Sequence, residues 1–205
     1  MIASSRDQES DKTAKYGAKL DDVLLAAAAV FSQKGFDQAS IRNVAERAGL
    51  SVAGLYYYVR SKEEALFEIQ YRAFDELVSK YKTQSADFRE PRDRLRLLVR
   101  NHLERFLKNI DELAVCSREL GRLDGELGRR IQDKQREYFR LVLKIFGELR
   151  EQNGGSRISA RTAALAMFGS INWVHTWYRP ESGPSASRLA DDFIELCLHG
   201  FLTGN

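Results

Sequence analysis

The sequence predicts an all-α protein with a small N-terminal head and a larger helical body, about nine helices in all. Three observations lead to this class. Apolar residues recur at helical spacing in most segments, strand-like alternation is absent, and glycine or proline separates one periodic segment from the next. Hydrophobic residues make up 43% of the 205 residues, which is enough for a core in one domain or in two small ones.

The N-terminal segment, residues 1–15, is polar, mixed in charge and without periodicity, so we expect a disordered arm there. The first helix is expected from about Ala18 to Gln33, and Gly35 ends it. Its predicted buried stripe consists of apolar residues about one turn apart, namely Leu20, Leu24, Ala27 and Phe31.

Two short helices around a glycine turn are predicted next. Ser40 can cap the first of them, and Gly49 ends it, because a chain reversal favours a residue that is free to take a positive φ. Ser51 can cap the second, which runs to about Tyr58, and a capping box at residues 61–64 starts another helix. This arrangement is a helix-turn-helix, whose second helix enters the major groove of DNA. The apolar positions of the first short helix are Ile41, Val44, Ala45 and Ala48.

At these residues the chain resembles the TetR family of transcriptional regulators. The resemblance implies a homodimer that represses transcription from a palindromic operator in double-stranded DNA and responds to a small-molecule effector. It implies a helix-turn-helix DNA-binding domain at residues 16–62 and a ligand-binding and dimerisation domain at residues 63–205. Gly54 and Val59 depart from the family pattern, which has a Thr-like and a Phe-like residue there. The matching residues are Gly35-Phe36, Ser40-Ile41, 44–51, Leu55-Tyr56 and 61–64.

The predicted recognition helix begins with small side chains, which allow its N-terminus to approach a phosphate or a base edge closely. Between Ser51 and Tyr58 there is no Arg, Asn or Gln for a bidentate base contact, so Arg42 on the preceding helix is the best candidate. One or two of the three consecutive tyrosines could instead pack the head. The resemblance implies DNA contacts at Ser40, Ser51, Val52, Ala53, Tyr56, Tyr57, Tyr58 and Lys62.

Six further helices are expected in the body, and the first of them, at about residues 62–82, carries two apolar stripes. A surface helix needs only one stripe, so this helix is expected to touch the head and also to line the body, although a plain core helix would look similar. The stripes are Leu66, Ile69, Ala73 and Leu77, and Phe67, Tyr71, Phe74, Val78 and Tyr81. The other helices are expected at about residues 91–109, 112–120, 126–152, 159–178 and 187–202.

Residues 169–180 resemble one branch of the family, which includes repressors that respond to acyl-CoA thioesters. Asn172 and His175 are polar groups on an otherwise apolar helix there and could bind a ligand carbonyl, or Asn172 could cap a neighbouring helix. Five arginines between residues 92 and 105 could meet CoA phosphates or a ligand carboxylate, or could form a solvated face paired with nearby carboxylates. A largely apolar acid or its CoA thioester is the expected effector. The candidate lining residues are Phe74, Phe106, Tyr138, Met167, Phe168, Ile171 and Asn172.

Small residues are frequent in the helix expected at residues 159–178, and the last helix carries a row of large apolar residues. Such a pair can form a four-helix bundle with its symmetry mate, which predicts a homodimer. The two tryptophans could belong to this interface or to the ligand site. The candidate dimer residues are Ala166, Gly169, Trp173, Phe193 and Leu196.

Catalytic, cofactor and metal sites are not expected. The three histidines lack metal spacing, the two cysteines form no CxxC motif, and no Walker loop, GxGxxG or GxSxG motif occurs. No segment approaches the ~20 apolar residues of a membrane span. The N-terminus lacks the apolar core of a signal peptide, so a cytoplasmic protein is expected. The net charge of +3 is too small to indicate DNA binding by itself.

Two alternatives to an acyl-responsive repressor stay open. A repressor of the same family could respond to cationic or multidrug compounds, which bind through acidic and aromatic residues. The middle helices favour this less, because they carry more arginine than carboxylate in apolar surroundings. A helical DNA binder or scaffold with no small-molecule effector would show the same helix pattern.

Overall fold

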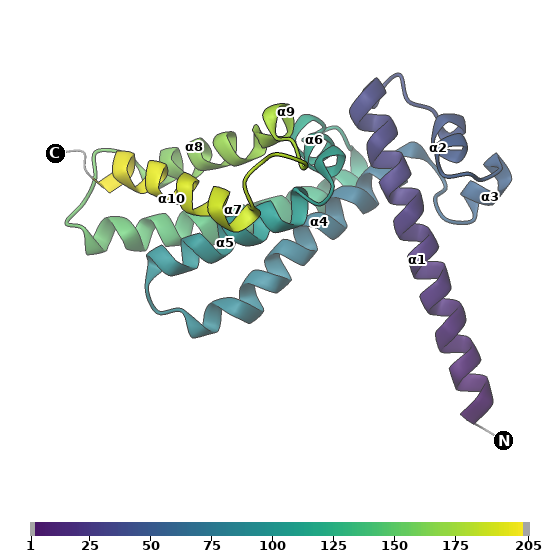
Figure 1. The fold of residues 1–205 in the computed structure, drawn as a ribbon, viewed down its shortest axis with the longest axis horizontal. Coiled ribbons are helices and arrows are strands. Elements are labelled where there is room, and N and C mark those ends of the chain that lie inside the picture. Colours follow the sequence, from purple (N-terminus) through teal and green to yellow (C-terminus); the bar gives the residue numbers. More distant parts are fainter. Residues whose placement is uncertain (1–2, 203–205) are drawn as a thin grey trace. The chain divides into compact units, whose positions relative to one another are not determined.

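The computed structural model describes the backbone of residues 3–202 and the side chains of residues 12–199. Over this range the chain forms ten α-helices, one short 3-10 helix and no strand (Figure 1), which confirms the all-α prediction. The chain divides into two compact units, Met1–Ile69 and Gln70–Asn205. Helix α4, Lys62–Gln84, contains the boundary between them. None of the described helices is both long enough and apolar enough to cross a membrane.

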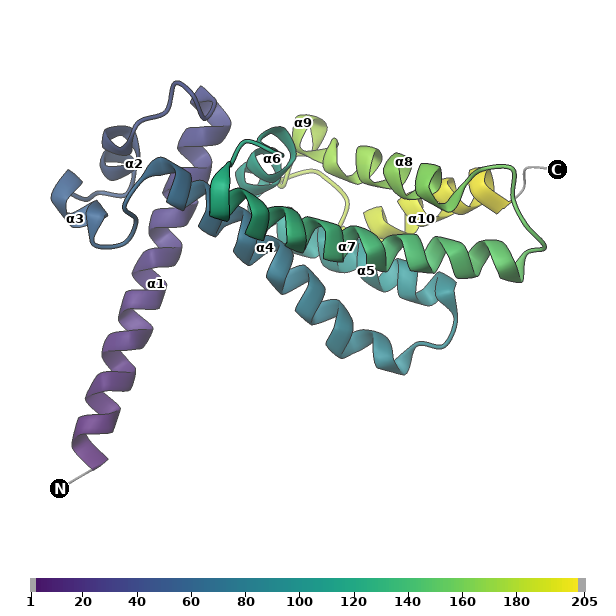
Figure 2. The ribbon, with the colours of Figure 1, turned by 180° about the vertical axis from the view of Figure 1, so that it is seen from behind.

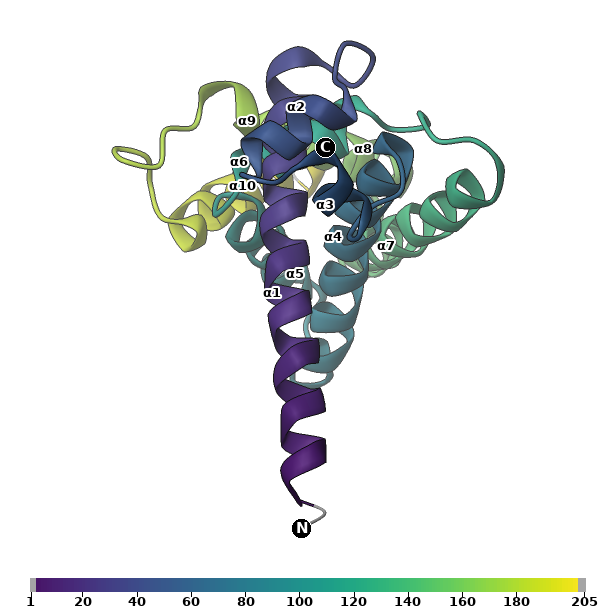
Figure 3. The same cartoon turned by 90° about the vertical axis from the view of Figure 1, so that its right-hand side faces the viewer.

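The first unit is built from three helices and the start of α4. Helix α2 packs on α1, and α3 packs on α2. Both lie at the end of α1 that is far from the N-terminus (Figure 3). Burial of each large apolar side chain contributes roughly 1.5–3 kcal/mol to this packing. The fully buried apolar residues of the unit include Val23, Ala27, Phe31, Val44, Leu55 and Leu66. The three helices are α1 (Ala3–Lys34), α2 (Ile41–Arg47) and α3 (Val52–Tyr56).

The predicted caps of the two short helices are confirmed. Ser40 Oγ accepts a hydrogen bond from the backbone N–H of Asn43 at 3.2 Å, and Ser51 Oγ accepts one from Gly54 at 3.0 Å. These bonds satisfy N–H groups that have no partner inside a helix. Gly49 follows α2 with a φ of +64°, where a residue with a Cβ would be strained.

Helix α1 is longer than the sequence predicted. It begins at Ala3, whereas a start near Ala18 and a disordered arm at residues 1–15 were expected. Residues 3–15 contain no glycine or proline and are rich in residues of adequate helix propensity, but they carry no apolar stripe. Periodicity therefore did not reveal this part of the helix. Its side chains at residues 12–16 are exposed, and Met1 and Ile2 lie outside the described residues.

The second unit is a bundle of long helices with shorter helices at one end. Helix α5 packs against α7 and α10, and α8 also packs against both of these helices. Figure 2 shows α7 and α8 side by side along this unit. Besides the rest of α4 and the 3-10 helix Ser85–Asp87, the unit contains α5 (Pro91–Phe106), α6 (Ile110–Arg118), α7 (Gly125–Gln152), α8 (Ala160–Asn172), α9 (Val174–Trp177) and α10 (Ala186–Leu202).

The helix expected at residues 159–178 is broken at Trp173 into α8 and α9, which accounts for the tenth helix. The backbone N–H of Thr176 bonds to Trp173 O instead of Asn172 O, so one turn is tightened. The Nδ1 atom of His175 lies 2.6 Å from the released Asn172 carbonyl oxygen and bonds to it. A side chain therefore replaces the helical donor at this carbonyl, which a periodicity pattern does not reveal.

Candidate DNA interface and ligand cavity

The recognition helix α3 begins with an exposed, small surface. Ser51, Val52 and Ala53 are exposed, whereas Leu55 is fully buried and anchors the helix in the first unit. A Cβ at Gly54 would lie 3.2 Å from Ser51 Oγ, which is a tight contact with the capping hydroxyl. The departure from a Thr-like residue at this position therefore keeps the cap of α3 unstrained.

The three consecutive tyrosines have different surroundings. Tyr56 is 51% exposed and Tyr57 is 71% exposed, while Tyr58 is half-buried. Tyr58 stacks on Tyr16 of α1 with ring centroids 5.3 Å apart, and Tyr57 meets Tyr16 edge-on at 5.5 Å. Tyr57 and Tyr58 thus pack partly against α1, whereas both Tyr56 and Tyr57 present a large surface to solvent. Tyr16 was missed at sequence level, because it lies outside the helix that periodicity detected.

Lys62 has a structural role in addition to its predicted DNA contact. Its Nζ atom donates hydrogen bonds to the carbonyl oxygens of Phe36, Asp37 and Ala39, at 3.0, 3.3 and 3.4 Å. It also lies 4.7 Å from the centre of the Phe36 ring. Lys62 therefore ties the start of α4 to the loop between α1 and α2.

Ser40 and Arg42 are both exposed at the start of α2. Ser40 is occupied as a helix cap, with Oγ also 3.0 Å from Asn43 Oδ1. Arg42 follows it in the first turn, on a helix that ends with another arginine, Arg47. Arg47 and Arg60 are exposed as well, and so are the acidic residues Asp37 and Glu46. The DNA contacts of these residues stay predictions.

A cavity of about 620 Å³ lies in the second unit, among α4, α5, α6, α7 and α8. This volume falls within the range of small-molecule sites. Five of the seven predicted lining residues line it: Phe74, Phe106, Tyr138, Phe168 and Asn172. Met167 lines a different groove, between α8 and α10, and Ile171 is fully buried in the core. Those two residues lie on other faces of α8, which the sequence pattern could not distinguish.

Aromatic rings form much of the cavity wall. The Tyr138 ring lies 5.5 Å from the Phe168 ring and 6.0 Å from the Phe74 ring. His102 lies nearly parallel to Tyr138 at 6.2 Å and meets Phe106 at 4.8 Å. Most of the wall is therefore apolar and can hold a hydrocarbon chain. The further lining residues, absent from the sequence prediction, are His102, Leu113, Cys116, Ser117, Leu120, Gln132, Gln135, Arg136, Phe139, Arg161 and Leu165.

The polar groups of the wall come from His102, Ser117, Gln132, Gln135, Arg136, Tyr138, Arg161 and Asn172. Burial lowers the pKa of His102 to about 3, and the nearby Asn172 opposes this effect only in part. The imidazole is therefore neutral at neutral pH. Burial also raises the pKa of the Tyr138 hydroxyl, which lies 3.3 Å from His102 Nδ1. No aspartate or glutamate lines this cavity, whereas Arg136 and Arg161 do.

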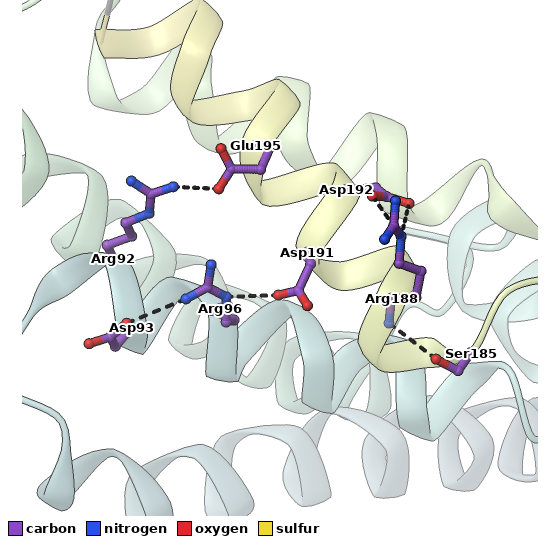
Figure 4. Close-up of polar contacts among 8 residues, drawn as sticks. All are labelled: Arg92, Asp93, Arg96, Ser185, Arg188, Asp191, Asp192 and Glu195. Atoms are coloured by element: carbon purple, nitrogen blue, oxygen red, sulfur yellow. Dashed lines mark hydrogen bonds and ion pairs between the residues drawn. The ribbon is translucent and has the colours of Figure 1, made fainter.

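The arginines of α5 are paired with carboxylates, mostly of neighbouring helices. Arg92 pairs with Glu195 and Arg96 with Asp191, both on α10 (Figure 4). None of the five arginines lines the 620 Å³ cavity. The alternative of a solvated, ion-paired face is therefore favoured over a site for CoA phosphates. The remaining pairs include Arg94 with Glu148, Arg100 with Glu104, and Arg105 with Glu76 and Glu112.

The predicted dimer residues lie on an exposed apolar surface of α8, α9 and α10. Ala166, Phe193 and Leu196 line a groove of about 320 Å³, and Leu196 is 73% exposed. Gly169 and Trp173 line the adjacent hollow, and Trp173 is 64% exposed. Large apolar side chains so exposed on one surface are typical of an interface.

The sequence matches known families over both units. Residues 23–69 match the family described as bacterial regulatory proteins, tetR family. Residues 89–201 match the family described as tetracyclin repressor-like, C-terminal domain. The second match alone covers more than half of the chain.

Several known proteins are similar to this chain over nearly its whole length. The HTH-type transcriptional repressor KstR2 of Rhodococcus jostii is 24% identical, over 93% of this chain and 95% of that protein. The fatty acid metabolism regulator protein of Bacillus subtilis is 21% identical, over 89% of this chain and 95% of that protein. The crystal structure of AibR in complex with isovaleryl coenzyme A and operator DNA superposes with a TM-score of 0.73 at 21% identity, covering 87% of this chain and 97% of that one.

Proposed function

The chain belongs to the TetR family of bacterial regulatory proteins, and on that premise we propose that a largely apolar acid or its CoA thioester releases it from its operator. The observation that carries the effector class is the cavity of about 620 Å³ in the second unit. Its wall is mainly aromatic and aliphatic, and its charged lining residues are two arginines. Such a site suits an apolar chain that carries a negatively charged or oxygen-rich group.

The names of similar proteins support this effector class. One relative is a fatty acid metabolism regulator, and AibR was crystallised with isovaleryl coenzyme A. A cationic ligand is less well supported, because no aspartate or glutamate lines the cavity to neutralise it. A DNA binder without an effector leaves the cavity without a role.

Operator binding is proposed to use two copies of the head. In a dimer, two α3 helices would enter successive major grooves about 34–36 Å apart on a palindromic site. The exposed surface of α8, α9 and α10, with Trp173 and Leu196, is the proposed dimer interface. The effector can weaken DNA binding only if it binds more tightly to a dimer conformation whose heads do not fit the operator.

The function is tested with three ligand classes in parallel. Butyryl-, octanoyl- and palmitoyl-CoA, the corresponding free acids and a cationic dye are added to the protein and to its complex with DNA from upstream of its own gene. An acyl compound is expected to raise the melting temperature by roughly 5–10 °C at a concentration about 100-fold above Kd. The same compound should release the DNA in a mobility-shift assay.

The outcomes separate the alternatives. Release by the dye and by no acyl compound would overturn the proposed effector class. Specific DNA binding without a response to any compound would leave a regulator with no effector of these classes. Failure to bind DNA would favour the helical scaffold.

A further inference from the structure

Unpaired polar atoms are concentrated at the cavity. Six buried side-chain polar atoms of the described residues have no hydrogen-bond partner of good geometry, although one of them, Arg105 Nε, lies 2.8 Å from Glu76 Oε2 in an ion pair. Three of the six, His102 Nε2, Ser117 Oγ and Gln135 Nε2, belong to residues that line the 620 Å³ cavity. They come from α5, α6 and α7, so three helices each supply one. Because buried polar groups are normally paired, such a set marks a place where a ligand supplies the missing partners.

The protonation of His102 decides which partner is missing. Its side chain is 2% exposed, and its imidazole is neutral, so only one ring nitrogen carries a proton. Nδ1 lies 3.3 Å from the Tyr138 hydroxyl in a contact whose direction depends on the tautomer, and we assign the hydroxyl as its donor. With that hydroxyl donating to Nδ1, the imidazole proton lies on Nε2. The Asn172 side chain, which lines the same cavity, lies close enough to raise the pKa of the ring, but its geometry leaves Nε2 without a hydrogen bond, so Nε2–H is a donor without a well-placed acceptor.

The other two atoms are also donors. Gln135 Nε2 is an amide nitrogen that can only donate, and the Ser117 hydroxyl donates or accepts. The three side chains are uncharged, whereas Arg136 and Arg161 supply positive charge elsewhere on the lining, with Arg136 itself exposed and 2.6 Å from Asp133. Neutral donors match a neutral oxygen acceptor, because an anion is better held by the arginines.

We propose that His102, Gln135 and Ser117 form a neutral donor site that recognises an uncharged carbonyl oxygen of the effector. This inference rests on the proposed acyl-type effector and deepens it. The effector would then carry its carbonyl against the three donors, with its hydrocarbon part on the rings of Phe106, Phe168 and their neighbours. Arg161 would take its anionic part, because Arg136 is already paired with Asp133.

The ligand chemistry itself supplies the test. Dissociation constants are measured by calorimetry for butyryl-, octanoyl- and palmitoyl-CoA and for the corresponding S-alkyl-CoA thioethers, which lack only the carbonyl oxygen. The wild-type protein is expected to bind the best thioester on the order of tenfold more tightly than its thioether, the factor expected for one buried hydrogen bond left unmade. Equal affinity for both members of every pair would overturn the neutral donor site and leave the acyl effector standing. Binding of neither member of any pair, and of none of the corresponding free acids, would overturn the proposed effector along with it.

Variants then assign the site. In Gln135→Met and His102→Phe, the ratio of thioether to thioester dissociation constants should fall towards one, because a donor is lost while side-chain size is kept. Gln152→Met, at the exposed end of the same helix α7, is the matched control and should keep the wild-type ratio. A wild-type ratio in both cavity variants, with helical content retained, would show that these donors do not meet the carbonyl.

Discussion

Single side chains of the first unit serve the fold and the proposed interface at once. Lys62 was assigned to a DNA phosphate from its position in the motif, yet its ammonium is bonded to three carbonyl oxygens of the loop after α1. A protonated amine can hold those carbonyls and still attract a phosphate, because both partners are negative or partly negative. The two roles have separate measurable consequences.

Substitution of Lys62 separates its structural role from its proposed phosphate contact. Lys62→Ala is expected to lower the free energy of unfolding by about 1–2 kcal/mol, measured by urea denaturation, because hydrogen bonds from a charged group are lost. If Lys62 also contacts a phosphate, the salt dependence of operator binding should fall by about one unit of slope. Lys144→Ala, at a 74% exposed side chain, is the control for general charge loss. Unchanged stability would contradict the structural role, and an unchanged slope would contradict the phosphate contact.

His102 couples the cavity to pH. Its pKa is about 3 in the folded protein and 6.5 in the unfolded chain, so the unfolded state takes up the proton more readily. The stabilisation from a neutral His102 is complete above pH 6.5 and is lost as the pH falls towards 3. Wild-type stability should therefore drop by about 2 kcal/mol between pH 7 and pH 5 on account of this residue.

The check is urea denaturation of wild type and His102→Phe at both pH values. The variant keeps a ring beside Phe106 but has no titrating group, so its stability should change less over this interval. An equal drop in both proteins would assign the pH dependence to other groups.

At the scale of elements, the ends of α7 show how sequence and packing combine. The helix begins at Gly125 and ends before Asn153, where the sequence predicted its limits. It contains two internal glycines with different surroundings. A Cβ at Gly128 would lie 2.1 Å from the carbonyl oxygen of Leu123, whereas nothing lies within 4 Å of a Cβ at Gly147. Only the first glycine is required by its neighbours.

The two positions form a matched pair of substitutions in one helix. Gly128→Ala should destabilise the protein by about 1–3 kcal/mol, because the backbone at Leu123 has to move. Gly147→Ala should stabilise it by roughly 0.5–1 kcal/mol, because alanine loses less conformational freedom in a helix. Thermal unfolding of both variants is the measurement. A similar shift for both would mean that the close approach at Gly128 is not maintained.

At the scale of the whole molecule, the arrangement of α8 and α10 determines which surface is left for a partner. Leu196, Trp173 and Leu165 are large, apolar and exposed. Leu165, however, lines the 620 Å³ cavity, so exposure alone does not identify the interface. Ala166 and Phe193 line the groove between α8 and α10, which favours that face for the symmetry mate.

Charge placed on that face should separate the subunits. Ala166→Glu or Gly169→Arg is expected to convert the dimer to a monomer in sedimentation and to abolish operator binding, while circular dichroism retains its helical signal. Lys144→Glu, at an exposed side chain of α7, is the control, and this variant should stay dimeric. A dimer for both interface variants would move the interface to another surface.

Much of the local structure could be predicted from the sequence, because local structure depends on neighbours within a few residues. Serine caps, glycine stops and apolar spacing located the two short helices of the motif and most of the longer ones. The differences between the predicted and the observed helices have local causes that the spacing of apolar residues does not reveal. Helix α1 extends to Ala3 through residues without an apolar stripe, and the His175 side chain takes a carbonyl at the break between α8 and α9.

The candidate site depended more strongly on the tertiary structure. The sequence suggested a mostly apolar pocket and named five residues that line the cavity, since aromatic residues on adjacent helices tend to meet. It could not show which face of α8 each residue occupies, and Met167 and Ile171 do not line the 620 Å³ cavity. It also gave His102 no role beyond the observation that the three histidines lack metal spacing. Whether a polar atom finds a partner depends on three helices meeting in space, and only the folded chain leaves His102, Ser117 and Gln135 unpaired around one cavity.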